Sequence, residues 1–311
     1  MNAQADVGLK RRVVFVIILI VTTVIARFLL RRMRNIVPRS HTSACFSTTP
    51  PPAVECKLLH FTCRTTAEAD EFRHSFRDCI PGCRLIHYDD DDIRRVVSKS
   101  GPHVLAAYDC VKPFAFKADI FRLCVLIDQG GLYLDANMRA RTGRLDRYVN
   151  FDAEHVFVRE NKNMKARLPY LNSIQFCDIA LWQAFIYTKH AGSAVLQYVL
   201  NGIVDRVLHL DKRVIASFLH PDDAILYFTG PTAFGEFAAQ ALGVSNWRQM
   251  QTTPQLQLLD FDGNDVHTQG GAQIVGKDKS NRMRHSTHYH AMYKNGGVVG
   301  VLCDSSSNDS P

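Results

Sequence analysis

A helical pattern that stops at two glycines and is followed directly by a short apolar strand constrains the fold more than any other feature. Residues 112–131 read KPFAFKADIFRLCVLIDQGG, with Pro113 suited to a first helical position and Gly130-Gly131 suited to a stop. A helix followed so closely by a strand is typical of an α/β domain. Spacings of i, i+4, i+7 and i+11 predict one buried stripe, formed by Phe116, Ile120, Leu123 and Ile127.

The strand after the glycines ends in a carboxylate. In GLYLD, residues 131–135, the two leucines share one face, whereas Tyr133 and Asp135 share the other. Open α/β sheets bind ligands at the carboxyl ends of their strands, so Asp135 is a candidate site residue. Asp119 and Arg122 lie three residues apart on the preceding helix, off the apolar stripe. Their spacing alone favours an ordinary surface ion pair.

Short apolar runs alternate with helical patterns over the rest of the chain. This alternation predicts an α/β domain built on a parallel sheet, which we place at residues 56–298. The acidic run Asp89–Asp92 suits the positive end of a helix and indicates a solvated helix start, not a metal site. The predicted strands are 57–62, 83–89, 155–160 and 256–261, and the other predicted helices are 63–78, 89–101, 193–210 and 229–242.

The positive charge of the chain is confined to its start. The formal net charge is +7, and residues 1–40 carry eight basic residues against one acidic residue, which leaves 29 of each sign in the remainder. A protein that follows a phosphate backbone needs basic residues over its folded part. Nucleic acid is therefore excluded as a partner.

A basic tail, residues 1–12, precedes an apolar segment. Residues 13–30 form an 18-residue apolar run with Arg27 near its end, which is just long enough for a membrane-spanning helix. No A-x-A-like cleavage site follows, so an uncleaved anchor is favoured over a cleaved signal peptide. Residues 31–55, rich in Pro, Ser and Thr, are predicted to form an extended stem, and residues 299–311 a disordered tail.

Anchor, stem and a neutral domain together suggest a single-pass type II membrane protein of the Golgi or ER lumen. Both flanks of the apolar segment are basic, and the downstream flank slightly more so. Charge alone therefore mildly favours a cytosolic domain, and the orientation stays open.

The nine cysteines contain no paired C-x2-C set, so a zinc module is not expected. Cys79 and Cys83 are close enough in sequence for a local bridge in an oxidising lumen. Cys124 lies inside the apolar helical pattern and is predicted to be a buried thiol.

Five segments, in order, resemble the glycosyltransferases that contain a DXD sugar-binding region. This family includes yeast-type initiating mannosyltransferases, inositol-phosphoceramide mannosyltransferases and α-1,4-galactosyltransferase-like enzymes. The likeness covers about residues 56–293 and is densest in residues 57–138. The segments are KLLHFT, PGCRLIHYDDDDI, KADIFRLCVLIDQGGLYLDANM, YFTGPTAF and HYHAMYKN.

The resemblance implies a GT-A type, Rossmann-like nucleotide-sugar-binding domain. It implies a metal-dependent, retaining transfer of a hexose from a UDP- or GDP-sugar to a hydroxyl of a glycan, glycolipid or protein. Charge develops on the departing diphosphate, and a divalent cation offsets it as a Lewis acid. Hard oxygen ligands suit Mn²⁺ or Mg²⁺ in that role.

The same resemblance implies a role for each matching side chain. Asp119, Arg122 and Asp135 become the catalytic residues, which reverses the surface-pair interpretation of the first two. The donor would contact these three residues together with His60, Phe61, Lys117 and Tyr133. The cation would be held by Asp135, Asn137 and His290.

The chain departs from the family pattern where DXD reads DAN. Asn137 replaces the carboxylate that normally binds the cation most directly, so a pseudoenzyme that binds a nucleotide-sugar or a partner without turnover is the alternative. Gln183 or Trp182 stands where the family often has asparagine, and Tyr293 replaces a C-terminal tryptophan. A membrane-anchored binding module on an α/β scaffold is a third hypothesis.

The histidines near the C-terminus allow another interpretation. A separate zinc cluster of His285, His288 and His290 lacks an evident fourth ligand. A histidine-bearing surface segment is the commoner explanation for the first two.

Overall fold

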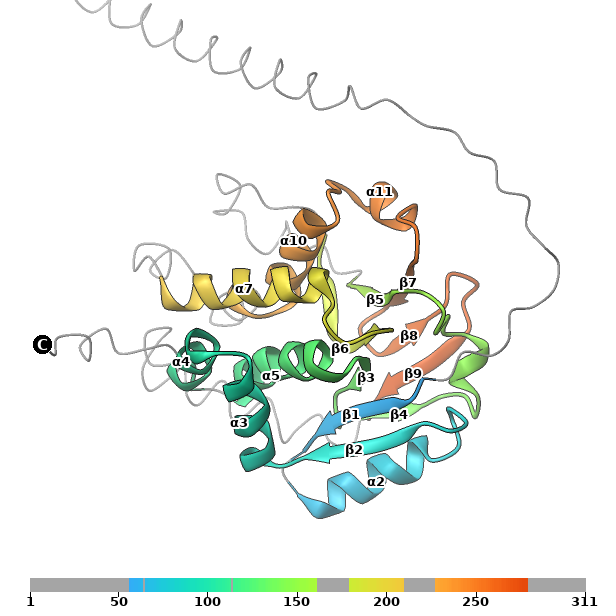
Figure 1. Cartoon of the computed structure of the whole chain (residues 1–311). Helices are drawn as coiled ribbons and strands as arrows, with labels where there is room; N and C mark the ends of the chain where they lie inside the picture. Colours follow the sequence, from blue (N-terminus) through green and yellow to red (C-terminus); the bar gives the residue numbers. More distant parts are fainter. Residues whose placement is uncertain (1–55, 64, 113, 161–178, 210–226, 279–311) are drawn as a thin grey trace, which may run out of the picture. The chain divides into compact units, whose positions relative to one another are not determined.

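The computed structural model describes residues 56–63, 65–112, 114–160, 179–209 and 227–278 (Figure 1). The strands are β1 (Leu58–Thr62), β2 (Arg84–Tyr88), β3 (Gly131–Leu134), β4 (Met138–Ala140), β5 (His155–Glu160), β6 (Leu181–Thr188), β7 (Leu256–Phe261), β8 (Asp265–His267) and β9 (Gln273–Lys277). The α-helices are α2 (Thr66–Phe76), α3 (Asp90–Lys99), α4 (Pro102–Cys110), α5 (Phe114–Gln129), α7 (Ala194–Leu208), α10 (Pro231–Ala241) and α11 (Trp247–Gln251), and a short 3-10 helix covers Leu145–Arg147.

Several predictions concern residues outside the described ranges. They are the basic tail (1–12), the anchor (13–30), the stem (31–55), the C-terminal tail (299–311) and the metal ligand His290. Among the described residues, none of the helices has both the length and the apolar character needed to span a bilayer.

The described strands form one mixed sheet in the order β2-β1-β3-β6-β5-β7-β8-β9-β4. The mixed α/β class is confirmed, but the expectation of a parallel sheet was wrong. β1 is parallel to β2 and β3, whereas β6 runs antiparallel to both β3 and β5. Local periodicity indicates that a segment is a strand, but it does not indicate in which direction the strand runs beside its neighbours. The expectation failed for this reason.

The sheet curls so that its β4 edge returns to β3. These two strands hold the third and ninth places in the sheet order, yet only residues 135–137 join them. A link of that length spans at most about 14 Å between the flanking Cα atoms. Figure 1 shows β4 beside β9, with which it pairs in the antiparallel direction. The predicted site residues Asp135 and Asn137 therefore belong to a tight link that closes the curl.

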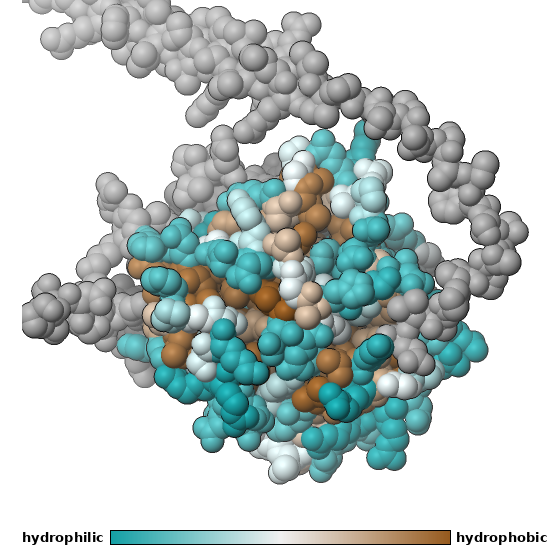
Figure 2. All heavy atoms as spheres, in the orientation of Figure 1, coloured by the Kyte–Doolittle hydropathy of each residue, from teal (hydrophilic) through white to brown (hydrophobic). Residues whose placement is uncertain are grey.

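Two apolar cores cover the two faces of the sheet. Helices α3, α4, α5, α7 and α10 pack on one face, and α2 packs on the other (Figure 1). Alternate residues of β3 and β5 enter different cores, as the pleat requires. In β3, for example, Tyr133 faces the larger core, whereas Leu132 and Leu134 face the smaller one. Figure 2 shows a largely polar exterior on one side of the molecule, with apolar residues gathered over α7.

The two glycines between α5 and β3 are required by backbone geometry. Gly130 has φ 69° and Gly131 has φ 96°, in the left-handed region that residues with a Cβ rarely adopt. The Gly130 amide bonds the Leu126 carbonyl at 2.9 Å and ends the helix. A Cβ on Gly131 would lie 2.6 Å from the Leu58 carbonyl oxygen of β1. Gly131 therefore allows β3 to pair closely with β1.

Replacing Gly131 by alanine is expected to lower the free energy of unfolding by about 2–4 kcal/mol, because backbone strain and overlap with β1 add. Urea unfolding measures this loss. Gly143→Ala is the matched control, since Gly143 has ordinary φ and a Cβ there would meet no atom within 4 Å. Equal stability of the two variants would show that the turn relaxes without cost.

The cysteine predictions had mixed outcomes. Cys124 is a fully buried free thiol, as expected. Cys79 and Cys83 are both free, so the proposed local bridge was wrong. The Cys79 sulfur points back toward the Ser75 carbonyl, whereas the Cys83 sulfur lies 3.9 Å from that of Cys56. Cys110 is disulfide-bonded.

Candidate active site

Helix α5 carries Asp119 and Arg122 into the interior of the protein. The two residues are only 6% and 5% exposed, and their side chains form an ion pair at 3.1 Å. The surface-pair interpretation from spacing alone was therefore wrong. Helix α5 is buried between the sheet and the neighbouring helices over most of its length. Ten of its residues are buried, namely Phe116 and residues 118–126. The polar pair lies on a buried face that the amphipathic pattern did not reveal.

Arg122 joins two carboxylates that come from different elements. Its Nη2 atom lies 3.1 Å from Asp119 Oδ1 and 3.2 Å from Asp135 Oδ1, at the end of β3. Its Nε atom donates to the Ala118 carbonyl at 3.1 Å, and its guanidinium carbon lies 5.0 Å from the centre of the Tyr133 ring. A buried guanidinium between two carboxylates leaves one net negative charge at this point, when both acids are ionised.

Asp119 is also held by a residue far along the chain. The Thr229 hydroxyl donates to Asp119 Oδ2 at 2.7 Å, across 110 positions of sequence. Thr229 is fully buried, and Gln183 of β6 donates to its carbonyl oxygen at 2.8 Å. Burial raises the pKa of Asp119 to about 6, although Arg122 and the Thr229 hydroxyl both act to lower it. The carboxylate is thus fixed from two sides.

Asp135 is the part of this cluster that faces outward. Its side chain is 30% exposed, while those of Arg122 and Asp119 are 6% and 9% exposed. The Tyr133 hydroxyl donates to Asp135 Oδ1 at 3.1 Å, and burial raises the pKa of Tyr133 well above its ordinary value, which keeps the phenol a donor. The Asp135 amide bonds the Ala184 carbonyl at 3.0 Å, which fixes where β3 ends.

Asn137 presents an amide oxygen that no other described residue bonds. Its Oδ1 atom is buried and has no hydrogen-bond partner among the described residues. Buried polar atoms are nearly always paired, so such an atom indicates a missing ligand, ion or water. It lies on the same short link as Asp135.

Comparison with known proteins bears on this geometry directly. Residues 65–142, which include α5, β3 and the link after it, match the model of the glycosyltransferase sugar-binding region containing a DXD motif. This stretch is therefore similar to the sugar-binding region of the DXD-containing glycosyltransferases. The resemblance found in the sequence is thereby confirmed for the sugar-binding region, without a choice among its subfamilies.

Two other comparisons add less. No curated protein sequence matches the chain. Among solved structures, the PaToxG glycosyltransferase is similar at a TM-score of 0.41 and 14% sequence identity, over 62% of this chain and 71% of that chain. That likeness is too weak to support a fold assignment.

The sugar-binding region offers oxygen ligands that suit a divalent cation. Asp135 supplies a partly exposed carboxylate, and the unpaired Asn137 oxygen lies two residues away. Mg²⁺ and Mn²⁺ prefer such hard oxygen ligands and usually keep waters or substrate phosphates as the others. Within the described residues, no group of three His, Cys, Asp or Glu side chains is placed to hold a metal. Asp135 and Asn137 could supply two oxygen ligands to such a cation.

Lys117 of the sugar-binding region contacts α4. Its Nζ atom donates to the Tyr108 carbonyl at 3.0 Å and lies 4.2 Å from the centre of the Tyr108 ring. Burial lowers the pKa of Lys117. These contacts give the lysine a structural role, and its predicted contact with the donor stays a prediction.

His60 and Phe61 of β1 precede the sugar-binding region and are both fully buried. The His60 ring nitrogens lie 2.9 Å from the Tyr88 hydroxyl and 2.8 Å from the Gly130 carbonyl oxygen, so both are occupied. Phe61 stacks on Phe72 of α2 at 4.2 Å between ring centres. Their predicted contact with the nucleobase finds no support in this geometry and stays untested.

The burial of His60 predicts a loss of stability in acid. Burial lowers its pKa from 6.5 to about 4, so between these values the unfolded chain binds a proton that the folded protein excludes. The contribution of His60 to stability is complete above pH 6.5 and falls as the pH approaches 4, by roughly 2–3 kcal/mol at pH 4.5, and His155, whose pKa burial also lowers to about 4, acts in the same direction. Urea unfolding at pH 7 and 4.5 measures this, and His60→Gln should show a smaller difference. An equal difference in the variant would assign the effect to other groups.

Sequence reasoning missed two residues of the cluster, Thr229 and Gln183. Thr229 lies in the segment YFTGPTAF, one of the five that carry the resemblance, and Gln183 stands where the family often has an asparagine. A buried polar residue that supports another side chain has no periodic signature. Only the contact with Asp119 reveals the role of Thr229.

Proposed function

We propose that the chain is a GT-A type, retaining hexosyltransferase that uses a UDP- or GDP-sugar, a divalent cation and a hydroxyl acceptor. One observation carries the proposal. Asp119 and Asp135 share the buried Arg122 at the end of β3, and the side-chain oxygen of Asn137, two residues further on, has no hydrogen-bond partner among the described residues. Fixed donors and acceptors around a partly exposed carboxylate suit recognition of a sugar and its phosphates.

The protein side chains divide into two groups in this proposal. Asp119 accepts hydrogen bonds from donor-sugar hydroxyls, and Arg122 donates to them while it keeps both carboxylates in place. Asp135 and Asn137 hold Mn²⁺ or Mg²⁺, with His290 as a further proposed ligand. When bound, the cation supplies Lewis-acid charge that offsets the negative charge of the departing diphosphate.

Thr229 fixes the carboxylate that receives the sugar. Its hydroxyl bonds one Asp119 oxygen at 2.7 Å and Arg122 pairs with the other at 3.1 Å. A carboxylate fixed before the substrate arrives loses little conformational freedom on binding, which favours the productive orientation. The raised pKa of Asp119, about 6, places its ionised form above that pH.

A pseudoenzyme is the second candidate function, favoured by Asn137. A neutral amide binds a divalent cation less strongly than a carboxylate does. A protein that bound a nucleotide-sugar through Asp119 and Arg122 but held the cation poorly would bind without transfer.

The deciding experiment uses the full-length chain with Mn²⁺ and a panel of UDP-glucose, UDP-galactose, UDP-N-acetylglucosamine and GDP-mannose. Release of UDP or GDP, with and without a hydroxyl acceptor, measures turnover, and titration calorimetry measures binding. Turnover that is lost in Arg122→Ala supports the transferase. Binding without turnover supports the pseudoenzyme. Absence of binding to every donor overturns both.

We further propose that residues 13–30 anchor the chain in a Golgi or ER membrane with the enzyme domain in the lumen, where the acceptor is a glycan, glycolipid or protein. Cys110 is disulfide-bonded, and the Cys56 and Cys83 sulfurs lie 3.9 Å apart, close enough to join in an oxidising compartment. Mass spectrometry after thiol alkylation, together with a glycosylation sequon introduced beyond residue 41, tests this. Unglycosylated protein with every cysteine alkylated would place the domain in the cytosol.

A further inference from the structure

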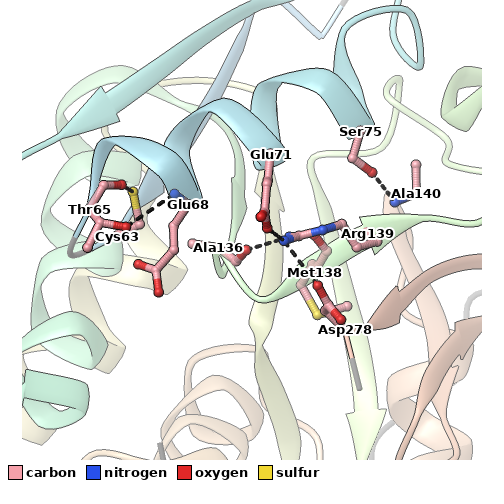
Figure 3. Close-up of polar contacts among 10 residues, drawn as sticks. All are labelled: Cys63, Thr65, Glu68, Glu71, Ser75, Ala136, Met138, Arg139, Ala140 and Asp278. Atoms are coloured by element: carbon pink, nitrogen blue, oxygen red, sulfur yellow. Dashed lines mark hydrogen bonds and ion pairs between the residues drawn. The ribbon is translucent and has the colours of Figure 1, made fainter. Parts of the chain in front are cut away.

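Arg139 and Asp278 hold the backbone of the link between Asp135 and Asn137 through hydrogen bonds. Arg139 Nη1 donates to the Ala136 carbonyl at 2.8 Å and to the Met138 carbonyl at 2.9 Å. The Asn137 carbonyl between them accepts the Asp278 amide at 2.8 Å. The three consecutive carbonyl groups of residues 136–138 are therefore all hydrogen-bonded, and Figure 3 draws Arg139 with Ala136 and Met138.

Arg139 is itself fixed by two carboxylates. Its Nη2 atom lies 2.8 Å from Glu71 Oε2 on α2 and 3.1 Å from Asp278 Oδ2, which follows β9. Its side chain is 16% exposed. The Ser75 hydroxyl accepts the Ala140 amide at 2.9 Å, so α2 is attached to β4 at a second point, as Figure 3 shows. A planar guanidinium can bond two carbonyls and two carboxylates at once, whereas an ammonium group cannot reproduce this geometry.

Asn137, the proposed cation ligand, has a neutral amide where the DXD motif has a carboxylate. With all three carbonyls bound, the peptide planes on both sides of Asn137 are fixed, and its side-chain oxygen is left without a partner among the described residues. An amide is a poorer ligand than a carboxylate, so any freedom lost on binding matters more for it. A link that is ordered beforehand avoids that loss.

We propose that Arg139, supported by Glu71 and Asp278, is the positioning residue that holds Asn137 ready to bind the divalent cation. This inference rests on the proposed metal-dependent function and adds to it the residue that compensates for the replaced carboxylate. Supporting residues around metal ligands commonly change metal affinity by about 10–100-fold when they are substituted.

If Arg139 had a purely structural role, its substitution would affect stability and not the affinity for the metal. If the residue only attached β4 to α2, Arg139→Lys would lower thermal stability without changing affinity for the metal in the folded protein. Arg141, two residues along the same chain, gives a matched control. It pairs with Asp265 at 2.9 Å, and its side chain is 36% exposed. Arg141→Lys makes the same exchange of guanidinium for ammonium, and the described hydrogen-bond partners of Arg141 are Asp265 and the Lys277 carbonyl, not the 135–137 link.

The test measures Mn²⁺ binding by electron paramagnetic resonance in the full-length chain, with UDP or GDP at saturation. Arg139→Lys is expected to weaken Mn²⁺ binding by about 10-fold or more, and Arg141→Lys to leave it unchanged. Glu71→Gln, a change at the surface of α2, is expected to weaken binding in the same direction by a smaller factor. This variant keeps the test valid should Arg139→Lys fail to fold.

The outcomes separate this inference from the proposed function. Wild-type affinity in folded Arg139→Lys, or in Glu71→Gln where the first variant does not fold, overturns the positioning role and leaves the transferase standing. A wild-type chain that binds no Mn²⁺ with either nucleotide overturns the metal-dependent function itself. Equal losses in Arg139→Lys and Arg141→Lys would reduce Arg139 to general stabilisation of β4.

Discussion

Asp119→Asn in α5 is expected to reduce sugar transfer by about 100-fold or more. The substitution keeps the shape of the side chain but removes its charge, so Arg122 loses one of its two carboxylate partners. Interactions with charged groups in a water-poor site contribute about 2–4 kcal/mol to transition-state binding, which corresponds to that factor. Initial rates of donor hydrolysis measure the loss.

Asp128→Asn is the matched control for this substitution. Asp128 lies on the same helix and its side chain is 37% exposed, 3.7 Å from Lys99. An exposed ion pair contributes little, so the control should keep wild-type rates and stability. If Asp119→Asn retained most of the activity, the donor sugar would have to bind elsewhere, and the proposed roles of Asp119 and Arg122 would be lost together.

Asn137→Asp is expected to strengthen Mn²⁺ binding by about 10–100-fold, because it replaces a neutral amide with the carboxylate that DXD proteins carry. The same change should destabilise the metal-free protein, since it places a charge on a buried atom that has no hydrogen-bond partner among the described residues. Added Mn²⁺ should restore stability by linkage, so the melting temperature of the variant should rise with Mn²⁺ concentration. Thermal unfolding and calorimetry with Mn²⁺ measure both effects.

This variant also distinguishes the two candidate functions. A pseudoenzyme that lacks only the second carboxylate should gain donor hydrolysis in Asn137→Asp, whereas an active transferase should mainly need less Mn²⁺ for the same rate. Asn201→Asp, an exposed change on α7, controls for the added charge. A variant with unchanged Mn²⁺ affinity would show that residue 137 does not face the cation.

Local sequence patterns predicted much of the fold near the site. The helix from 114 to 129, the glycine turn after it and the strands at 155–160 and 256–261 were expected with nearly the observed ends. These elements have strong apolar periodicity or clear stop signals, which act over a few residues. Strand direction and order have no such local signature, so the antiparallel β6 and the curl that returns β4 to β3 were not expected.

In the candidate site, too, local sequence indicated some features, and contacts between distant segments decided others. Asp135 was a candidate from its place at the end of a strand, whereas spacing alone assigned Asp119 and Arg122 to a surface ion pair, and only the family resemblance brought these two residues into the site. The bond from Thr229 to Asp119 and the contacts of Arg139 with Glu71 and Asp278 could not be predicted from the sequence. They join segments that are far apart in sequence and meet only after the sheet has curled and two cores have packed against it. Contacts of that kind depend on the three-dimensional path of the whole domain.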